Sequence, residues 1–123
     1  MRLPGLIGHE FDTVDLSKPT PRPIEILASS PQNGAGSGRA VSADVPYYVA
    51  ASGAGVLNVG TEGWSCGLPT VAMVTDRCPT TSPPAAEERV IERATRTILL
   101  TFARGPAGRV HPARDFLTGQ VSH

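Results

Sequence analysis

The order of apolar and polar residues along the chain predicts three strands before residue 61. The segment Ile24 to Ser29 begins with β-branched residues and carries one charged position, Glu25, so it is predicted to be a largely buried strand. Val45 to Ala50 and Gly55 to Gly60 are the next two strand candidates. The four residues between them have the length and glycine content of a hairpin turn, which predicts an antiparallel pair.

One later segment, Ala85 to Arg104, repeats its apolar residues at helical spacing and predicts a long amphipathic helix. Its apolar face comprises Val90, Ile91, Ala94, Ile98, Leu99 and Phe102. Ser82 and Pro83 suit the helix start, and Gly105 suits its end because glycine readily adopts the left-handed conformation. The other face carries Arg89, Glu92, Arg93 and Arg96, and we interpret it as a solvated face or a subunit interface.

Two further segments are predicted to be irregular. Residues 32–42 hold three glycines and almost no apolar residue, which predicts a flexible loop, and residues 107–123 are expected to run along the surface as a tail. The chain, 1–123, is therefore predicted to be a single domain of the α/β class. We expect three to five strands and one long amphipathic helix.

Composition makes the predicted core thin. Leucine, isoleucine, valine and phenylalanine together number 28 of 123 residues, and glycine plus proline number 25. Eleven basic residues balance eleven acidic residues, which argues against a nucleic-acid partner. The sequence has no apolar run of membrane-spanning length and no secretory leader pattern, so we expect a cytoplasmic protein without a membrane partner.

A short motif raises the possibility of a stand-alone serine hydrolase. Residues 63–67, Gly-Trp-Ser-Cys-Gly, fit the G-x-S-x-G pattern that exposes a nucleophilic serine, and Asp76 and His111 follow Ser65 in the appropriate chain order. However, Pro69 stands where the helix after such a motif would begin. We therefore keep the triad Ser65, Asp76 and His111 as an alternative and interpret Ser65 first as a structural serine beside Trp64.

Glycine-rich and ligand-rich segments give weaker indications. The turn from Gly53 to Thr61 contains incomplete nucleotide-binding patterns, so a small anion-binding module is a second alternative, although tight turning explains its glycines better. His9, Glu10, Asp12 and Asp15 are close in sequence, but no second histidine or cysteine stands at ligand spacing, so we expect a polar loop and no metal site.

The aromatic and sulfur groups give no clearer site. Tyr47 and Tyr48 should face opposite sides of a strand, so at most one is expected to be buried. Cys66 and Cys78 are expected to be inert thiols in a reducing compartment. The residues themselves therefore identify no catalytic group, cofactor-binding group or metal ligand beyond the weak triad.

Several blocks of sequence resemble the C-terminal region of the large (β) subunit of N,N-dimethylformamidase and its relatives. The blocks occur in the same order along the chain: 5–12, 26–31, Ala43-Asp44, 46–48, 51–56, Gly60-Thr61 and Trp64. Residues 102–109 and 111–115 are similar to the end of that region. The resemblance implies a partial glutamine-amidotransferase-like, Rossmann-like layer in a subunit of a metal-dependent amide hydrolase.

The resemblance also implies that the chemistry lies elsewhere. The family's iron is held by tyrosine and glutamate side chains upstream of the matched segment, so the resemblance gives no metal ligand to this chain, and Tyr47 and Tyr48 are not assigned as ligands. We therefore expect a domain that is catalytically incomplete alone. Its expected role is to complete a sheet and to associate with itself or with other parts of a larger amide-hydrolase assembly.

Overall fold

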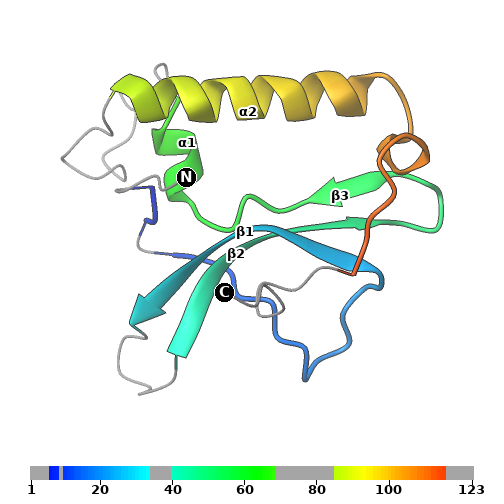
Figure 1. The fold of residues 1–123 in the computed structure, drawn as a ribbon, viewed down its shortest axis with the longest axis horizontal. Helices are drawn as coiled ribbons and strands as arrows, with labels where there is room; N and C mark the ends of the chain where they lie inside the picture. The colour runs from blue at the N-terminus through cyan, green and yellow to red at the C-terminus, as the bar shows by residue number, and fades with distance from the viewer. Residues whose placement is uncertain (1–5, 9, 34–39, 69–84, 116–123) are drawn as a thin grey trace, which may run out of the picture.

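The computed structural model describes residues 6–8, 10–33, 40–68 and 85–115. These residues form β1 (Ile24–Asn33), β2 (Ala40–Val49), β3 (Gly55–Leu57), α1 (Gly63–Cys66), α2 (Ala85–Ala103) and the 3-10 helix η1 (Ala107–Arg109). The strands make one antiparallel sheet in the order β1-β2-β3, and α2 lies along the β3 side of it (Figure 1). The α/β class, the three strands and the long helix are confirmed, whereas the described sheet contains no parallel pair of the Rossmann-like type.

The first two strands form a hairpin that is longer than the sequence predicts. Gln32 pairs with Val41 and Asn33 pairs with Ala40, so both strands extend into the predicted loop 32–42. Cross-strand hydrogen bonding accounts for this extension, because a ladder satisfies backbone groups whether or not the side chains are apolar. The register shifts between Ile26 and Ala28, which marks a bulge at Leu27.

Pro46 limits the pairing of β2 with β3, on the side of β2 away from β1. Its carbonyl oxygen accepts a hydrogen bond from the Asn58 N–H at 3.1 Å, but its own nitrogen has no hydrogen to donate to the neighbouring strand. The Asn58 side chain instead accepts the Gly60 N–H at 2.8 Å, in a local turn. As a result, β3 ends at Leu57, and the predicted strand Gly55 to Gly60 is shorter than expected.

An N-terminal segment takes the place that β3 leaves beside β2. The Asp44 N–H donates to the Asp12 carbonyl at 2.8 Å, and the Asp12 N–H donates to the Gly60 carbonyl at 2.9 Å. Phe11 and Thr61 form an antiparallel bridge next to these bonds. The segment around Asp12 therefore lies between β2 and the chain that follows β3.

The carboxylate of Asp44 fixes this arrangement. Only 5% of Asp44 is exposed, and its side-chain oxygens accept the Val14 N–H at 2.9 Å and the Ser29 hydroxyl at 2.7 Å. Gly60 adopts a φ of +74° beside it, and a Cβ there would overlap the Asp44 carbonyl oxygen. The N-terminal segment, β1 and β2 are thus tied together at one buried side chain.

Helix α2 is anchored near its middle. Ile91 is 1% exposed and packs against Gly67, and the Trp64 indole N–H donates to the Thr95 hydroxyl at 3.0 Å. Gly105, at a φ of +120°, follows the helix end as predicted. Leu99 is 64% exposed, so the prediction that it belongs to the packed face is wrong.

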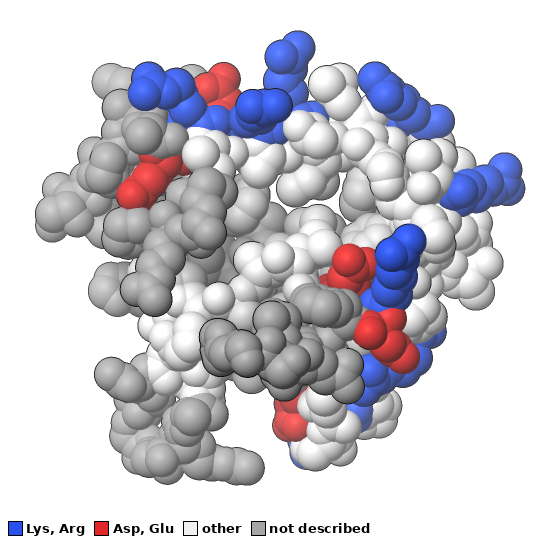
Figure 2. Space-filling view, viewed as in Figure 1, with Lys and Arg blue, Asp and Glu red and all other residues white. Residues whose placement is uncertain are grey.

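The other face of α2 is basic. Arg89, Arg93 and Arg96 are exposed as predicted, and Figure 2 shows basic side chains gathered over the helix. Ser82 and Pro83, the expected start of the helix, lie outside the described residues. Among the residues that the structure describes, no helix is both long enough and apolar enough to cross a membrane.

The prediction of inert thiols is wrong for Cys66. Cys66 lies in α1, is 7% exposed and is disulfide-bonded. The sequence holds one other cysteine, Cys78, which lies outside the described residues. Because disulfides persist mainly in oxidising compartments, this bond does not fit the reducing compartment that was expected for the two cysteines.

Replacing Asp44 by alanine should destabilise the fold by about 2–4 kcal/mol, because two donors lose a charged acceptor inside the protein. Urea unfolding followed by circular dichroism measures this loss. Asp12→Ala is the matched control: its carboxylate is exposed and accepts one bond, from the Asn58 amide at 2.8 Å. That variant should lose less than about 1 kcal/mol. Equal losses in the two variants would contradict the central role of Asp44.

Candidate functional site

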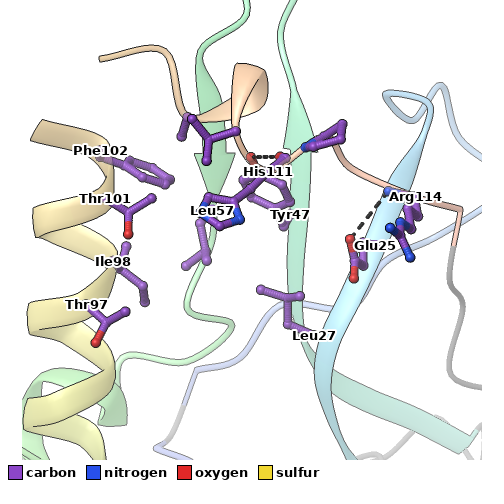
Figure 3. Close-up of a pocket in the computed structure, with 13 residues that line it drawn as sticks. Glu25, Leu27, Tyr47, Leu57, Thr97, Ile98, Thr101, Phe102, His111 and Arg114 are labelled. Carbon is purple, nitrogen blue, oxygen red and sulfur yellow. Dashed lines mark hydrogen bonds between the residues drawn. The ribbon is translucent and has the colours of Figure 1, made fainter. Parts of the chain in front are cut away.

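A pocket of about 420 Å³ lies between the C-terminal half of α2, the sheet and the segment that follows η1 (Figure 3). It is partly open to solvent. Its lining combines apolar side chains with a few polar groups: Glu25, Leu27, Tyr47, Leu57, Thr97, Ile98, Thr101, Phe102, Ala107, Val110, His111, Pro112 and Arg114. Such a mixture is typical of a binding site.

The pocket exists because α2 does not close onto the sheet. The backbone of η1 packs against β2, whereas the backbone of α2 comes close to each strand at few points at most. Ile98 and Phe102 point from the helix toward Leu57 and Leu27, but the opposing side chains do not fill the space (Figure 3). Leu27 remains 52% exposed. The inner face of α2 is therefore only partly buried.

Tyr47 forms the inner wall of the pocket. It is 7% exposed, and its hydroxyl donates to the His111 carbonyl at 2.7 Å. Gly55 makes room for it, since a Cβ there would lie 2.9 Å from the phenol oxygen. Burial and the neighbouring Glu25 carboxylate raise the pKa of the Tyr47 phenol above its ordinary value. As predicted, only one of the two adjacent tyrosines is buried.

Residues 107–115 bring the last wall of the pocket into place. The Gly108 N–H donates to the Gly53 carbonyl at 2.9 Å, and the Arg114 N–H donates to the Glu25 carboxylate at 3.4 Å. Ala107 is only 4% exposed. The described part of the predicted surface-running tail, 107–115, is therefore anchored across the sheet, and residues 116–123 lie outside the described residues.

Asp115 completes this anchor at the start of β1. Its carboxylate accepts the Ile24 N–H at 2.9 Å and pairs with the Arg22 guanidinium at 3.2 Å. The hydrogen bond from Ile24, followed by the hydrogen bond and positive charge of Arg22, holds the pKa of Asp115 below its ordinary value. The carboxylate is therefore ionised at neutral pH and remains an acceptor for the strand.

The structure does not bring the predicted hydrolase triad together. Ser65 lies in α1, where its hydroxyl donates to the Glu62 carbonyl at 2.9 Å, as a structural serine does. His111 follows η1 and lines the pocket, and Figure 1 places α1 and η1 toward opposite ends of α2. Asp76 lies outside the described residues.

The segment Gly53 to Thr61 uses its glycines for tight turning, as predicted. Gly53 has a φ of +86°, and its N–H donates to the Ala50 carbonyl at 2.8 Å. The N–H groups of Ala54 and Gly60 also donate to side-chain oxygens of the protein. These three N–H groups therefore donate to acceptors within the protein and are not directed at an anion.

The described residues do not fit the iron that the sequence resemblance implies. No group of three or more histidine, cysteine, aspartate or glutamate side chains among them could hold a metal ion, and His9 lies outside the described part. Tyr47 and Glu25 line one pocket, but the Tyr47 proton is engaged and its phenol pKa is raised, which disfavours the tyrosinate that would bind iron. Tyr47 is better suited to a structural or binding role.

The pKa of Tyr47 can be measured in a Tyr48→Phe variant, which leaves Tyr47 as the chain's one tyrosine. Absorbance at 295 nm should show a phenol titration with a midpoint above 10. Because the folded-state pKa is raised, the folded protein binds more protons than the unfolded protein in this range, and stability should fall as the pH rises above about 10. A midpoint at or below 10 would contradict the buried environment of this hydroxyl.

The Asp115 anchor predicts the opposite pH dependence. A depressed carboxyl pKa contributes stability above the unfolded-state pKa, and this contribution is lost as the pH falls through the folded-state pKa. The Ile24 amide resonance should therefore shift in an NMR titration with a midpoint below about 3.9. Asp115→Asn should abolish that transition. If the Ile24 amide titrates equally in the variant, another group is responsible.

The comparisons with known proteins identify one family. The family model described as N,N-dimethylformamidase beta subunit-like, C-terminal, matches residues 1–80, which include all three strands and α1. The resemblance expected for residues 102–115 lies outside this match. No curated protein and no solved structure matches the chain. Because the match covers well over half of its length, the chain belongs to the N,N-dimethylformamidase beta subunit-like C-terminal family.

Proposed function

We propose that this chain is a structural and subunit-association domain of a metal-dependent amide hydrolase and is catalytically incomplete alone. The open pocket between α2 and the sheet carries the proposal, since apolar groups of both elements line it without closing it. A domain that was complete by itself would gain stability by filling this space, at about 25 cal/mol per Å² of apolar surface. Another part of the large subunit is proposed to cover it.

Two surfaces could contact another part of the enzyme: the edge strand β1, by addition of a further strand, and the pocket. The features of β1 favour the pocket. In the described sheet β1 is an edge strand with three protective features: a bulge at Leu27, a residue without N–H at Pro31, and the Asp115 carboxylate on the Ile24 N–H. Such features hinder pairing with a further strand. The pocket side of the molecule is therefore the proposed contact surface, and completion of a sheet through β1 has less support.

The catalytic residues, and any iron, are proposed to lie in the part of the enzyme outside this chain. The membership of the chain in a beta subunit family supports this division. So does the separation of Ser65 from His111, which leaves no assembled nucleophile and base among the described residues. A glutamine-amidotransferase-like setting for the sheet is part of the same proposal, with the remaining layers supplied by the covering part.

Association can be tested with the remainder of an N,N-dimethylformamidase large subunit produced without its C-terminal region. Isothermal titration calorimetry should detect binding to this chain. Ile98→Lys should weaken the binding at least tenfold. It replaces an apolar side chain, whose full burial contributes about 1.5–3 kcal/mol of free energy, by a charged one. Leu99→Lys is the matched control, since Leu99 is the next residue of the same helix and is already 64% exposed.

A second variant separates a loss of binding from a loss of folding. Thr101→Arg fills the same pocket from a polar position, so it should block association without removing apolar packing. Circular dichroism should show the helix intact in every variant. If the remainder of the subunit does not bind, or if it binds the Ile98→Lys and Thr101→Arg variants as well as the wild type, the proposed role of this surface is wrong.

A further inference from the structure

Three of the polar groups that line the pocket offer hydrogen-bond acceptors to a ligand, beside the donors of Arg114 and the side chains of Thr101 and His111. The Tyr47 hydroxyl donates its one hydrogen bond to the His111 carbonyl, so toward a ligand its oxygen can only accept a hydrogen bond. The Thr97 hydroxyl likewise donates to the Arg93 carbonyl at 2.8 Å. Glu25 contributes a carboxylate, which is an acceptor at neutral pH. The pocket therefore suits a ligand group that donates hydrogen bonds.

Among the described residues, no cationic side chain forms an ion pair with Glu25. Its carboxylate accepts one backbone bond, from the Arg114 N–H, and the one ion pair found among the described residues joins Arg22 to Asp115. The negative charge also acts on the Tyr47 phenol and helps to raise its pKa. A cation entering the pocket would thus meet a carboxylate that still has accepting capacity, although the Arg114 side chain opposes it from the rim.

We propose that this pocket binds a primary alkylammonium group, with the cation at Glu25 and the apolar stem between the sheet and α2. An ammonium group carries three donors and no acceptor, which matches the acceptors at Glu25 and Tyr47. The stem would pack against Leu27, Leu57 and Ile98 (Figure 3). Phe102 lies on the helix side of the pocket and adds apolar surface for the stem.

Two sources can present this group. In the assembled subunit it would be a lysine side chain of the part that covers the pocket, and that assignment rests on the proposed function. A free small amine would present the same chemistry to the chain alone. The chemical preference of the pocket can therefore be measured without the rest of the subunit.

The preference is tested with n-butylammonium, butyrate and butanol at neutral pH, which share a four-carbon stem. Amide NMR titrations of the folded chain should show saturable shifts at the pocket with n-butylammonium. Butyrate and butanol should bind at least threefold more weakly, which is the scale expected for a partly exposed charge pair. Equal binding of the three probes would show a merely apolar pocket and overturn the proposal.

Three variants test the assignment of Glu25. Glu25→Gln keeps the shape of the side chain and should weaken n-butylammonium binding about threefold or more. Glu92→Gln removes an equal charge from the exposed face of α2 and should leave binding unchanged. Arg114→Gln keeps the backbone bond to Glu25 but removes the opposing charge, so it should tighten binding. If Glu25→Gln and Glu92→Gln behave alike, the carboxylate is not the binding group.

Competition separates this proposal from the proposed function. If n-butylammonium displaces the remainder of the large subunit and Glu25→Gln weakens that association, a lysine side chain is the source. If the remainder does not bind but n-butylammonium does, in a Glu25-dependent way, the association role fails and the alkylammonium site stands. If the remainder binds and neither the amine nor the Glu25 variant affects it, the alkylammonium site is wrong and the association role stands.

Discussion

The buried carboxylate of Asp44 is the constraint on which the rest of the fold depends. A carboxylate removed from water is costly unless donors surround it, and here the Val14 amide and the Ser29 hydroxyl supply them. The Val14 bond requires an extended N-terminal segment beside β2, and the Ser29 bond ties β1 to the same point. One side chain thus determines how three segments that are distant in sequence lie together.

This constraint also shapes the pocket. The N-terminal segment occupies the first half of β2, and Pro46 separates it from the second half, where β3 pairs over only three residues. The short β3 carries Gly55 to the side of Tyr47, where η1 and the following segment pack. Helix α2 is held near its middle by Ile91 and by the bond from Trp64 to Thr95, so its C-terminal part spans the sheet without closing on it.

Much of this fold is predictable from local patterns, and the pocket is not. The helix, the buried start of β1 and the Gly53 turn follow from periodicity and glycine placement, and the structure confirms them. The extension of β1 and β2 into the glycine-rich loop follows from pairing, which apolar periodicity does not report. The lone charge of Glu25 in an apolar strand is a signal that could have indicated the pocket, whereas its contact with residue 114 depends on long-range packing.

The pocket is built from two parts of the chain, of which only the first lies within the segment that matches the family. Glu25, Leu27, Tyr47 and Leu57 lie within the segment that matches the family, whereas the walls from α2 and from the segment after η1 lie beyond residue 80. Three anchors connect these parts: Tyr47 to His111, Glu25 to Arg114, and Ile24 to Asp115. Each anchor is a hydrogen bond between a side chain and a backbone group. Only one residue of each pair therefore needs a particular side chain. The acceptors at Glu25 and Tyr47 therefore belong to the family segment, whereas the Thr97 hydroxyl belongs to α2, which can adapt to the occupant without breaking any of these three anchors.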